Sequence, residues 1–410
     1  MGPDPVASET HQEEITVHWN LLNVRNLFSP SGVIEWIADL WQERGIPLPG
    51  PLPPLAWHHL AGGGTPIKDW YGERSRQGSG GGSRWTNLAF GAPEGGEPPD
   101  NEDLEGIYHV PVMPEEVIEW LVPARGKLIL DGTFGGGGHS RRLLAGGAGV
   151  LALDRDADAL MQAGELACDW PDDFVALRTT FDRYPEILEE AGVAGLDGIL
   201  LDLGVSSWQV DSPNRGFSFR YDGPLDMRMD RDAPLTAEEI VNTWPPEELA
   251  RIFYAYGEEK ASRRVAAAIV ASRRRKPVLT TAELAGIVAS VVPKHSGAHP
   301  ATKVFQALRI AVNDELGYLE RALEQAHRCL RPGGRLAVIT FHSLEDRIVK
   351  NYMRRHAEPF IDRPEWPAPR PNPECYYRLP VRKAITASAA ERAANPRSRS
   401  AKLRIAERLP

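Results

Sequence analysis

The most constraining feature of this chain is a glycine-rich junction between an apolar run and a helix-like segment. The run LILD, residues 128–131, leads directly into GTFGGGGHSRRLL. Glycine allows the backbone to approach a ligand without obstruction by a Cβ atom, and helix N-termini attract negatively charged groups. A strand-to-helix turn of this composition is typical of the ligand-binding edge of an open α/β sheet.

Further apolar runs alternate with helical patterns from residue 107 onward. Buried strands are predicted at 127–131, 149–154, 197–203 and 334–341, and helices at 113–121 and 316–330. PGG at 332–334 is interpreted as a helix stop before the last of these strands. Strands that alternate with helices predict an α/β fold with a parallel sheet.

Between Asp211 and Asp314 no run of this strand type occurs, and the patterns are helical. Helices are predicted at 236–244, 246–256, 262–275 and 280–292. We therefore predict three parts. The expected boundaries are an extension at 1–105, an α/β domain at 106–212 and 313–410, and an inserted helical domain at 213–312.

The extension has a composition of its own. It holds 15 of the 56 acidic residues and only six Lys or Arg, which accounts for the whole formal charge of −9. One amphipathic helix is predicted at 33–40, and the Pro-, Gly- and Ser-rich remainder is typical of linker or disorder. The sequence assigns no function to this part.

The remaining chain is neutral overall but contains two basic segments. Lys260–Lys276 has seven basic and no acidic residues, and Arg378–Pro410 has nine basic and two acidic residues. Such segments can meet the phosphates of a nucleic acid, although solvated surfaces explain each segment equally well.

Other signals exclude several classes of protein. No apolar run approaches the length of a membrane span, and the N-terminus lacks the regions of a signal peptide, so we expect no membrane contact and a cytoplasmic location. The three cysteines are far apart in sequence, which predicts reduced thiols and no metal site. The sequence gives no indication of oligomeric state.

The glycine-rich loop narrows the choice of cofactor. A P-loop requires a lysine directly after Gly137, where Gly138 stands, and a dinucleotide loop requires a third glycine where Ser140 or Arg141 stands. Asp131 at one strand end can accept from the ammonium of a methionine-like group, and Asp154 at the next can accept from both ribose hydroxyls. S-adenosyl-L-methionine fits best, while a dinucleotide enzyme and a turn without a ligand remain as alternatives.

A third strand end, LLDLGVSSWQVD, places Asp202 beside the first two. Methyl transfer is an in-line displacement that depends on alignment and exclusion of water. For an exocyclic amine, Asp202, Ser206 and a backbone carbonyl near Gly204 or Val205 are candidate acceptors of its N–H groups. A buried aspartate satisfied by amides is the alternative for Asp202. The aromatic residues that follow suit either base stacking or core packing: Trp208, Phe217, Phe219 and Tyr221.

Longer motifs carry a resemblance to a known family. GTFGGGGHS, ILLDLGVSS, DGPLDMRMD, HPATKVFQALRIAVNDEL and FHSLEDRIVK together resemble the bacterial small-subunit (16S) ribosomal RNA cytosine-N4 methyltransferase family, RsmH or MraW. The likeness runs from about His109 to Glu407. It implies a Rossmann-like S-adenosylmethionine-dependent methyltransferase sheet in which the helical insertion at 213–312 is a substrate-recognition domain.

The resemblance also implies a reaction and a set of contacts. Methylation of N4 of a decoding-centre cytidine is expected, with ribosomal RNA in the small ribosomal subunit as partner. The cofactor contacts carried over by motif are Gly137, Gly138, His139, Asp154, Phe181, Asp202 and Gln209. An RNA-binding ribosome-assembly factor with a vestigial cofactor pocket is the competing hypothesis.

Two features depart from the expected patterns. The Asp/Asn/Ser-Pro-Pro-aromatic motif of DNA amino-methyltransferases is replaced by Asp202-Leu-Gly-Val, so amine activation by that motif is not expected. His342 and Ser343 in FHSLEDRIVK suit the substrate side of the pocket, but a helix cap at Ser343 explains them almost as well.

Overall fold

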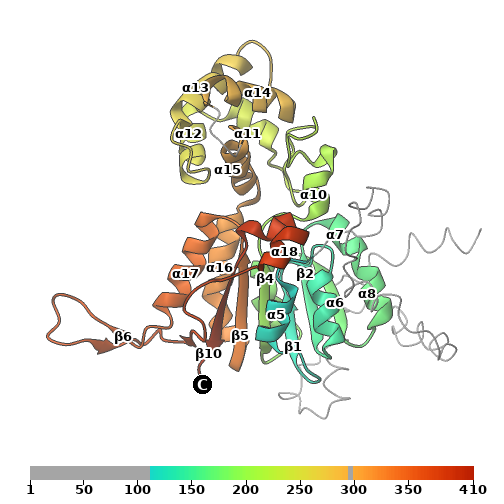
Figure 1. Ribbon diagram of the computed structural model, residues 1–410, viewed down its shortest axis with the longest axis vertical. Coiled ribbons are helices and arrows are strands. Elements are labelled where there is room, and N and C mark those ends of the chain that lie inside the picture. Colours follow the sequence, from blue (N-terminus) through green and yellow to red (C-terminus); the bar gives the residue numbers. More distant parts are fainter. Residues whose placement is uncertain (1–110, 294–298) are drawn as a thin grey trace, which may run out of the picture. The chain divides into compact units, whose positions relative to one another are not determined.

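A computed structural model describes residues 111–293 and 299–410. The extension 1–105, with the helix predicted at 33–40, lies outside the described residues. The described chain forms an eight-stranded sheet in the order β3-β2-β1-β4-β5-β10-β8, with β9 paired to β10 (Figure 1). A mostly parallel sheet flanked by helices confirms the predicted fold class.

Five parallel strands form the body of the sheet. They are β1 (Leu128–Asp131), β2 (Gly149–Asp154), β3 (Phe174–Arg178), β4 (Leu196–Asp202) and β5 (Leu330–Thr340). β10 (Lys402–Arg408) pairs antiparallel with β5, and it also meets the short strands β8 (Tyr377–Arg378) and β9 (Ile385–Thr386). The sequence predicted four of the parallel strands and missed β3 and β10.

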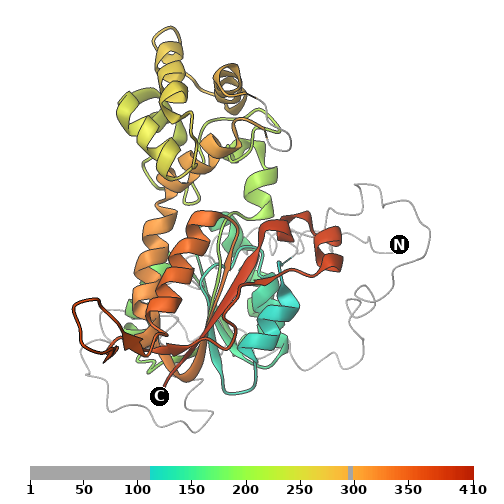
Figure 2. The same ribbon diagram turned by 60° about the vertical axis from the view of Figure 1, so that its left-hand side comes forward.

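Alternate residues of each strand face opposite sides of the sheet and build two cores. Leu128 and Leu130 pack with α9 (Tyr184–Glu190), α16 (Glu315–Cys329) and α17 (Ser343–Arg355). Ile129 and Val150 pack on the other face, against four further helices. These are α5 (Pro114–Leu121), α6 (Gly138–Ala145), α7 (Ala157–Met161) and α8 (Ala163–Asp169). Both views show this three-layer arrangement (Figures 1 and 2).

Five of the helices between β4 and β5 pack around a core of their own. They are α11 (Ala237–Thr243), α12 (Pro246–Ala255), α13 (Ser262–Arg273), α14 (Thr281–Val291) and α15 (Thr302–Asn313). Figures 1 and 2 show this group beyond the sheet edge at which β4 ends. Within the described part of 213–312, β-type pairing is limited to one isolated bridge between Pro224 and Thr280. The exact domain boundaries stay a prediction.

The role predicted for PGG at 332–334 is wrong. α16 ends at Cys329, and β5 begins at Leu330, so PGG lies inside the strand. The pairing of β4 with β5 changes register between Leu196 and Gly198, where Leu330 and then Arg335 are the partners. This irregularity accommodates PGG within the strand. α16 has already ended before PGG, because Leu330 has an extended backbone.

The described chain ends in smaller elements. A two-stranded hairpin of β6 (Phe360–Ile361) and β7 (Arg370–Pro371) projects beyond the sheet (Figure 1). α18 (Ala389–Ala394) and the 3-10 helix η4 (Pro396–Ser400) precede β10. No helix among the described residues is long and apolar enough to cross a membrane.

Candidate active site

The strand order reverses between β1 and β4, and a cavity of about 690 Å³ lies at the carboxyl ends of these strands. Open α/β sheets hold their ligands at this kind of switch point. Most of the predicted site residues line the cavity: Gly138, His139, Asp154, Phe181, Asp202, Ser206 and Gln209. Segments distant in sequence therefore converge on one place, while the role of each residue stays a prediction.

Asp131 lies beneath the glycine-rich loop, outside the cavity lining. It is fully buried, and its carboxylate accepts the Ser140 hydroxyl at 2.7 Å and the Thr133 N–H at 3.2 Å. Burial raises the pKa of Asp131, while His139, Ser140 and Thr133 act in the opposite direction. These contacts fix both ends of the loop, so Asp131 shapes the cavity floor.

Gly137 also lies behind the lining, where it is the N-cap of α6. Its φ of 73° is in the left-handed region, and a Cβ atom there would stand 2.7 Å from Cζ of Phe134. A side chain at this position would therefore strain the turn and push against a buried ring. The glycine allows the tight turn that presents Gly138 and His139 to the cavity.

Asp154 at the end of β2 lines the cavity, and its carboxylate is hydrogen-bonded to the glycine-rich loop. One carboxylate oxygen accepts the Gly135 N–H at 2.8 Å, and the other accepts the Asp156 N–H at 2.8 Å. Burial raises the pKa of Asp154 to about 6, although both N–H donors oppose that shift. The carboxylate is ionised at neutral pH and can accept further hydrogen bonds, as ribose hydroxyls require.

Asp202 is the last residue of β4, and its side chain lies beside that of His139 in the cavity lining. Nε2 of His139 lies 3.4 Å from Oδ2 of Asp202, and both side chains are buried. Neither ring nitrogen of His139, nor Oδ1 of Asp202, has a hydrogen-bond partner among the described residues. Buried polar atoms are rarely left unpaired, so these atoms indicate a place for a polar ligand.

Ser206 and Gln209 have structural roles as well as a place in the lining. They form a capping box on α10 (Ser207–Asp211): the Gln209 N–H donates to the Ser206 hydroxyl, and the Ser206 N–H donates to the Gln209 side chain. Gln209 also donates to Asp156 at 2.7 Å. The Ser206 hydroxyl retains its proton for donation, while its acceptor capacity is partly used.

The buried side chain of Arg215 links several segments of this region by hydrogen bonds. It is 2% exposed and donates to Asp156 and Asp158 at 2.8 Å each. It also donates to the carbonyls of Arg228 and Met229 at 3.0 Å. The motifs around 154–158, 206–209 and 226–230 are therefore joined by one buried guanidinium.

The four aromatic residues predicted to stack or pack are divided between two environments. Phe219 packs against His299 and Phe305, and Phe217 lies against the core of the helical group. Trp208 and Tyr221 are 45% and 58% exposed. The first pair packs in the interior, and stacking remains a prediction for the second pair.

His342 caps α17. Its Nδ1 accepts the Glu345 N–H, and Glu345 accepts the N–H of His342, so the cap is His342 and not Ser343. Ser343 donates instead to Glu258 at 2.9 Å. The predicted Ser343 cap is therefore wrong.

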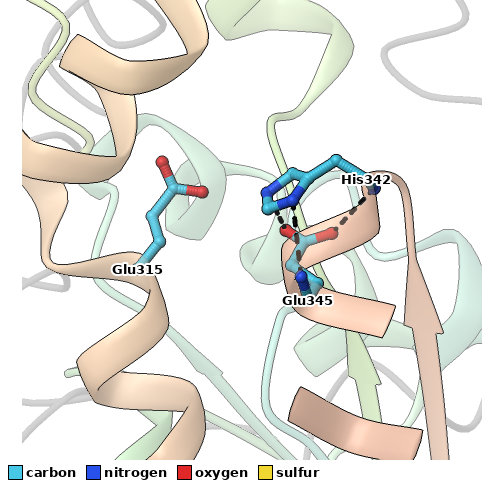
Figure 3. Close-up of side chains that lie close together, drawn as sticks. All are labelled: Glu315, His342 and Glu345. Carbon is cyan, nitrogen blue, oxygen red and sulfur yellow. Dashed lines mark hydrogen bonds and ion pairs between the residues drawn. The ribbon is translucent and has the colours of Figure 1, made fainter. Parts of the chain in front are cut away.

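Four charged residues that line the cavity were missed by sequence reasoning. Arg309 lies on α15, Glu315 on α16, Glu345 on α17 and Arg397 on η4, and all four line the cavity. Their motifs were recognised, but no local pattern gave these side chains a role. Figure 3 shows Glu315 facing His342 and Glu345 across a short gap.

Comparisons with known proteins agree with this architecture. The model of the MraW methylase family matches residues 106–409. Three curated relatives are named "Ribosomal RNA small subunit methyltransferase H". The Rhodospirillum centenum protein is 53% identical over 303 residues, covering 73% of this chain and 92% of its own length. The Symbiobacterium thermophilum protein is 46% identical over 315 residues, covering 74% and 97%. The Granulibacter bethesdensis protein is 49% identical over 308 residues, covering 73% and 91%. This chain belongs to the MraW methylase family, which is the family that its motifs resemble.

Proposed function

We propose that this methylase transfers a methyl group from S-adenosyl-L-methionine to N4 of a decoding-centre cytidine in small-subunit (16S) ribosomal RNA. Membership of a methylase family supports the reaction class, and the names of the relatives support the RNA. The cytidine and its N4 atom come from the motif resemblance. The small ribosomal subunit in the cytoplasm is the expected partner.

The observation that carries the proposal is the polar cavity at the strand edge. Asp154 offers an ionised carboxylate, and His139 and Asp202 offer buried atoms without partners among the described residues. These groups fit the hydroxyl, ammonium and carboxylate groups of S-adenosylmethionine, which supplies an electrophilic methyl group when bound. Gly138 and Gln209 border the same space, and Phe181 offers a ring to the adenine.

We assign the chemistry to alignment and to acceptance of amine hydrogens. Asp202 stands at the edge of the cavity, held by the hydrogen bond from its N–H to the Thr133 hydroxyl at 2.6 Å. Its unpaired oxygen can accept an N–H of the target amine, and the Ser206 hydroxyl is close in sequence on the same wall. The amine lone pair then points toward the methyl group.

The test is transfer of labelled methyl to small ribosomal subunits that lack the modification. Wild type should form N4-methylcytidine, identified by mass spectrometry of the nucleosides. Asp202→Ala should lose at least about 100-fold of the rate because it removes a positioned acceptor. A surface variant, Glu248→Gln, provides the control because its pair with Arg251 is exposed. Label on another nucleoside would refute the assignment of the acceptor.

The competing function is an RNA-binding assembly factor with a vestigial pocket. The exposed basic residues in and next to α13 favour RNA binding under either function: Lys260, Arg263, Arg264, Arg274 and Arg275. The intact Asp154 and Asp202 disfavour a vestigial pocket. Tight subunit binding with demonstrable cofactor binding and no turnover would support the assembly factor.

A further inference from the structure

The cavity wall opposite the glycine-rich loop contains an ion pair that the proposed cofactor contacts do not use. Arg309 donates from Nε and Nη2 to both carboxylate oxygens of Glu315, at 2.8 and 2.9 Å. The side chains are 16% and 8% exposed, and both residues line the cavity. This is a rigid, bidentate pair at the meeting point of α15 and α16.

A second carboxylate increases the negative charge of this wall. Glu345 is 2% exposed, and one of its oxygens lies within 4.8 Å of a Glu315 oxygen (Figure 3). Burial raises the pKa of Glu345, but His342 and Arg309 outweigh that effect and the net shift is downward. Glu345 is therefore held between His342 and the charge of Arg309, close to the carboxylate of Glu315.

Packing alone does not account for such a pair. Apolar side chains of similar volume generally hold helices together at least as well, because a buried ion pair loses hydration that its attraction only partly repays. The pair also borders open cavity instead of closing a core. Charged groups placed at a cavity wall are candidates for ligand recognition.

The hydrogen-bonding pattern of the pair matches one edge of a base. A Glu315 oxygen can accept an N–H, and Nη1 of Arg309 carries two further N–H donors beside it. Cytosine presents an amine donor next to the N3 and O2 acceptors. Uracil presents an acceptor and then an N–H donor at the corresponding places, so it would meet both groups with the wrong polarity.

We propose that the Arg309–Glu315 pair reads the Watson–Crick edge of the target cytosine. Glu315 accepts one amine hydrogen, and Arg309 donates to the ring acceptors. This inference rests on the proposed function and adds the residues that select the base. It leaves Asp202, on the other wall, to accept the second amine hydrogen.

The test is a competition between small subunits that carry cytidine or uridine at the target position. Wild type should bind the cytidine-bearing subunits about 10-fold to 100-fold more tightly, as expected for a bidentate base contact. Glu315→Gln should reduce that preference to about twofold or less. It should also lower kcat/KM for methylation by about 30-fold, while cofactor affinity, measured by calorimetry, stays within about twofold.

Two further variants make the result decisive. Arg309→Met/Glu315→Leu replaces the pair with apolar groups and should fold, because both charges of the pair are removed together and Glu345 keeps His342 and the Phe341 N–H as partners. It should lose the base preference as well. Glu248→Gln, in the exposed Glu248–Arg251 pair, is the matched surface control and should keep it.

The possible outcomes separate this inference from the proposed function. A wild type that methylates cytidine, together with a folded Glu315→Gln variant that keeps the preference, would overturn the role of the pair alone. Equal binding of cytidine- and uridine-bearing subunits by wild type would do the same. A wild type without methylation of the subunits would overturn the proposed function and this inference together.

Discussion

Arg215→Met should destabilise the protein strongly, because it leaves two aspartates without their buried cation. Asp156 is 3% exposed and forms an ion pair with Nη2 of Arg215 at 2.8 Å. Asp158 pairs with Nη1 of the same guanidinium. Removing one partner of a buried ion pair costs about 3–5 kcal/mol. With about 2.1 cal/mol/K of unfolding entropy per residue over the roughly 300 described residues, that corresponds to a fall in unfolding temperature of roughly 5–8 °C.

Thermal unfolding followed by circular dichroism measures this effect, with Arg251→Met as the control. Arg251 and Glu248 form an exposed pair on α12, so its loss should cost less than about 1 kcal/mol. Arg215→Met/Asp156→Asn should recover part of the loss, because it removes the buried charge that Arg215 compensates. Cofactor affinity should also fall in Arg215→Met, since Gln209 is held by Asp156.

The reasoning would be refuted if Arg215→Met unfolded within about 2 °C of the Arg251→Met control. That result would mean that water reaches Asp156 and solvates it when the guanidinium is removed. A large fall in stability with unchanged cofactor affinity would instead separate the two roles. The network would then support the fold without positioning α10.

Three further predictions concern the loop, the strand edge and the basic helix. Cofactor affinity of wild type should weaken as pH falls through about 6, where Asp154 takes up a proton, and calorimetry on Asp154→Asn should show weak, pH-independent binding. The folded protein binds that proton more tightly than the unfolded chain does, so the contribution of Asp154 to the free energy of unfolding falls as pH rises from about 4 to 6. Denaturant unfolding of Asp154→Asn should lack this pH dependence. Gly137→Ala should cost about 1–3 kcal/mol in denaturant unfolding, whereas Gly164→Ala, with no atom within 4 Å of its new Cβ, should not destabilise. Arg263→Glu/Arg264→Glu should raise KM for subunits and reduce the salt dependence of binding, with cofactor affinity unchanged.

Sequence periodicity predicted the centre of the sheet because its strands are buried on both faces. LILD, GVLALD and ILLD read as continuous apolar runs, and the structure places them side by side as β1, β2 and β4. β10 was missed because it alternates: Leu403 and Ile405 are buried while Lys402 and Arg404 are partly exposed and pair with Asp346. β3 was missed because it is an edge strand whose apolar run FVAL ends in the exposed Arg178, without the carboxylate that ends β1, β2 and β4.

In the candidate site, too, a local sequence pattern separates the residues that were predicted from those that were missed. Asp154 and Asp202 were found because a carboxylate at the end of an apolar run is a local signal that places it at the sheet edge. Arg309 and Glu315 were missed because they sit on helices, where charged residues usually face solvent. Only the three-dimensional arrangement shows that they are largely buried and border the cavity.

The place of the helical insertion explains why the cavity has two walls of different chemistry. A parallel connection must leave the carboxyl end of one strand and return to the opposite edge of the sheet. The chain leaves β4 at Asp202, beside the switch point. The insertion between β4 and α16 therefore lies at the end of the sheet where the parallel strands have their carboxyl ends. The first strands therefore supply loop amides and carboxylates on one side. The returning helices α15 and α16 supply the Arg309–Glu315 pair on the other, where an acceptor base would stand opposite the cofactor.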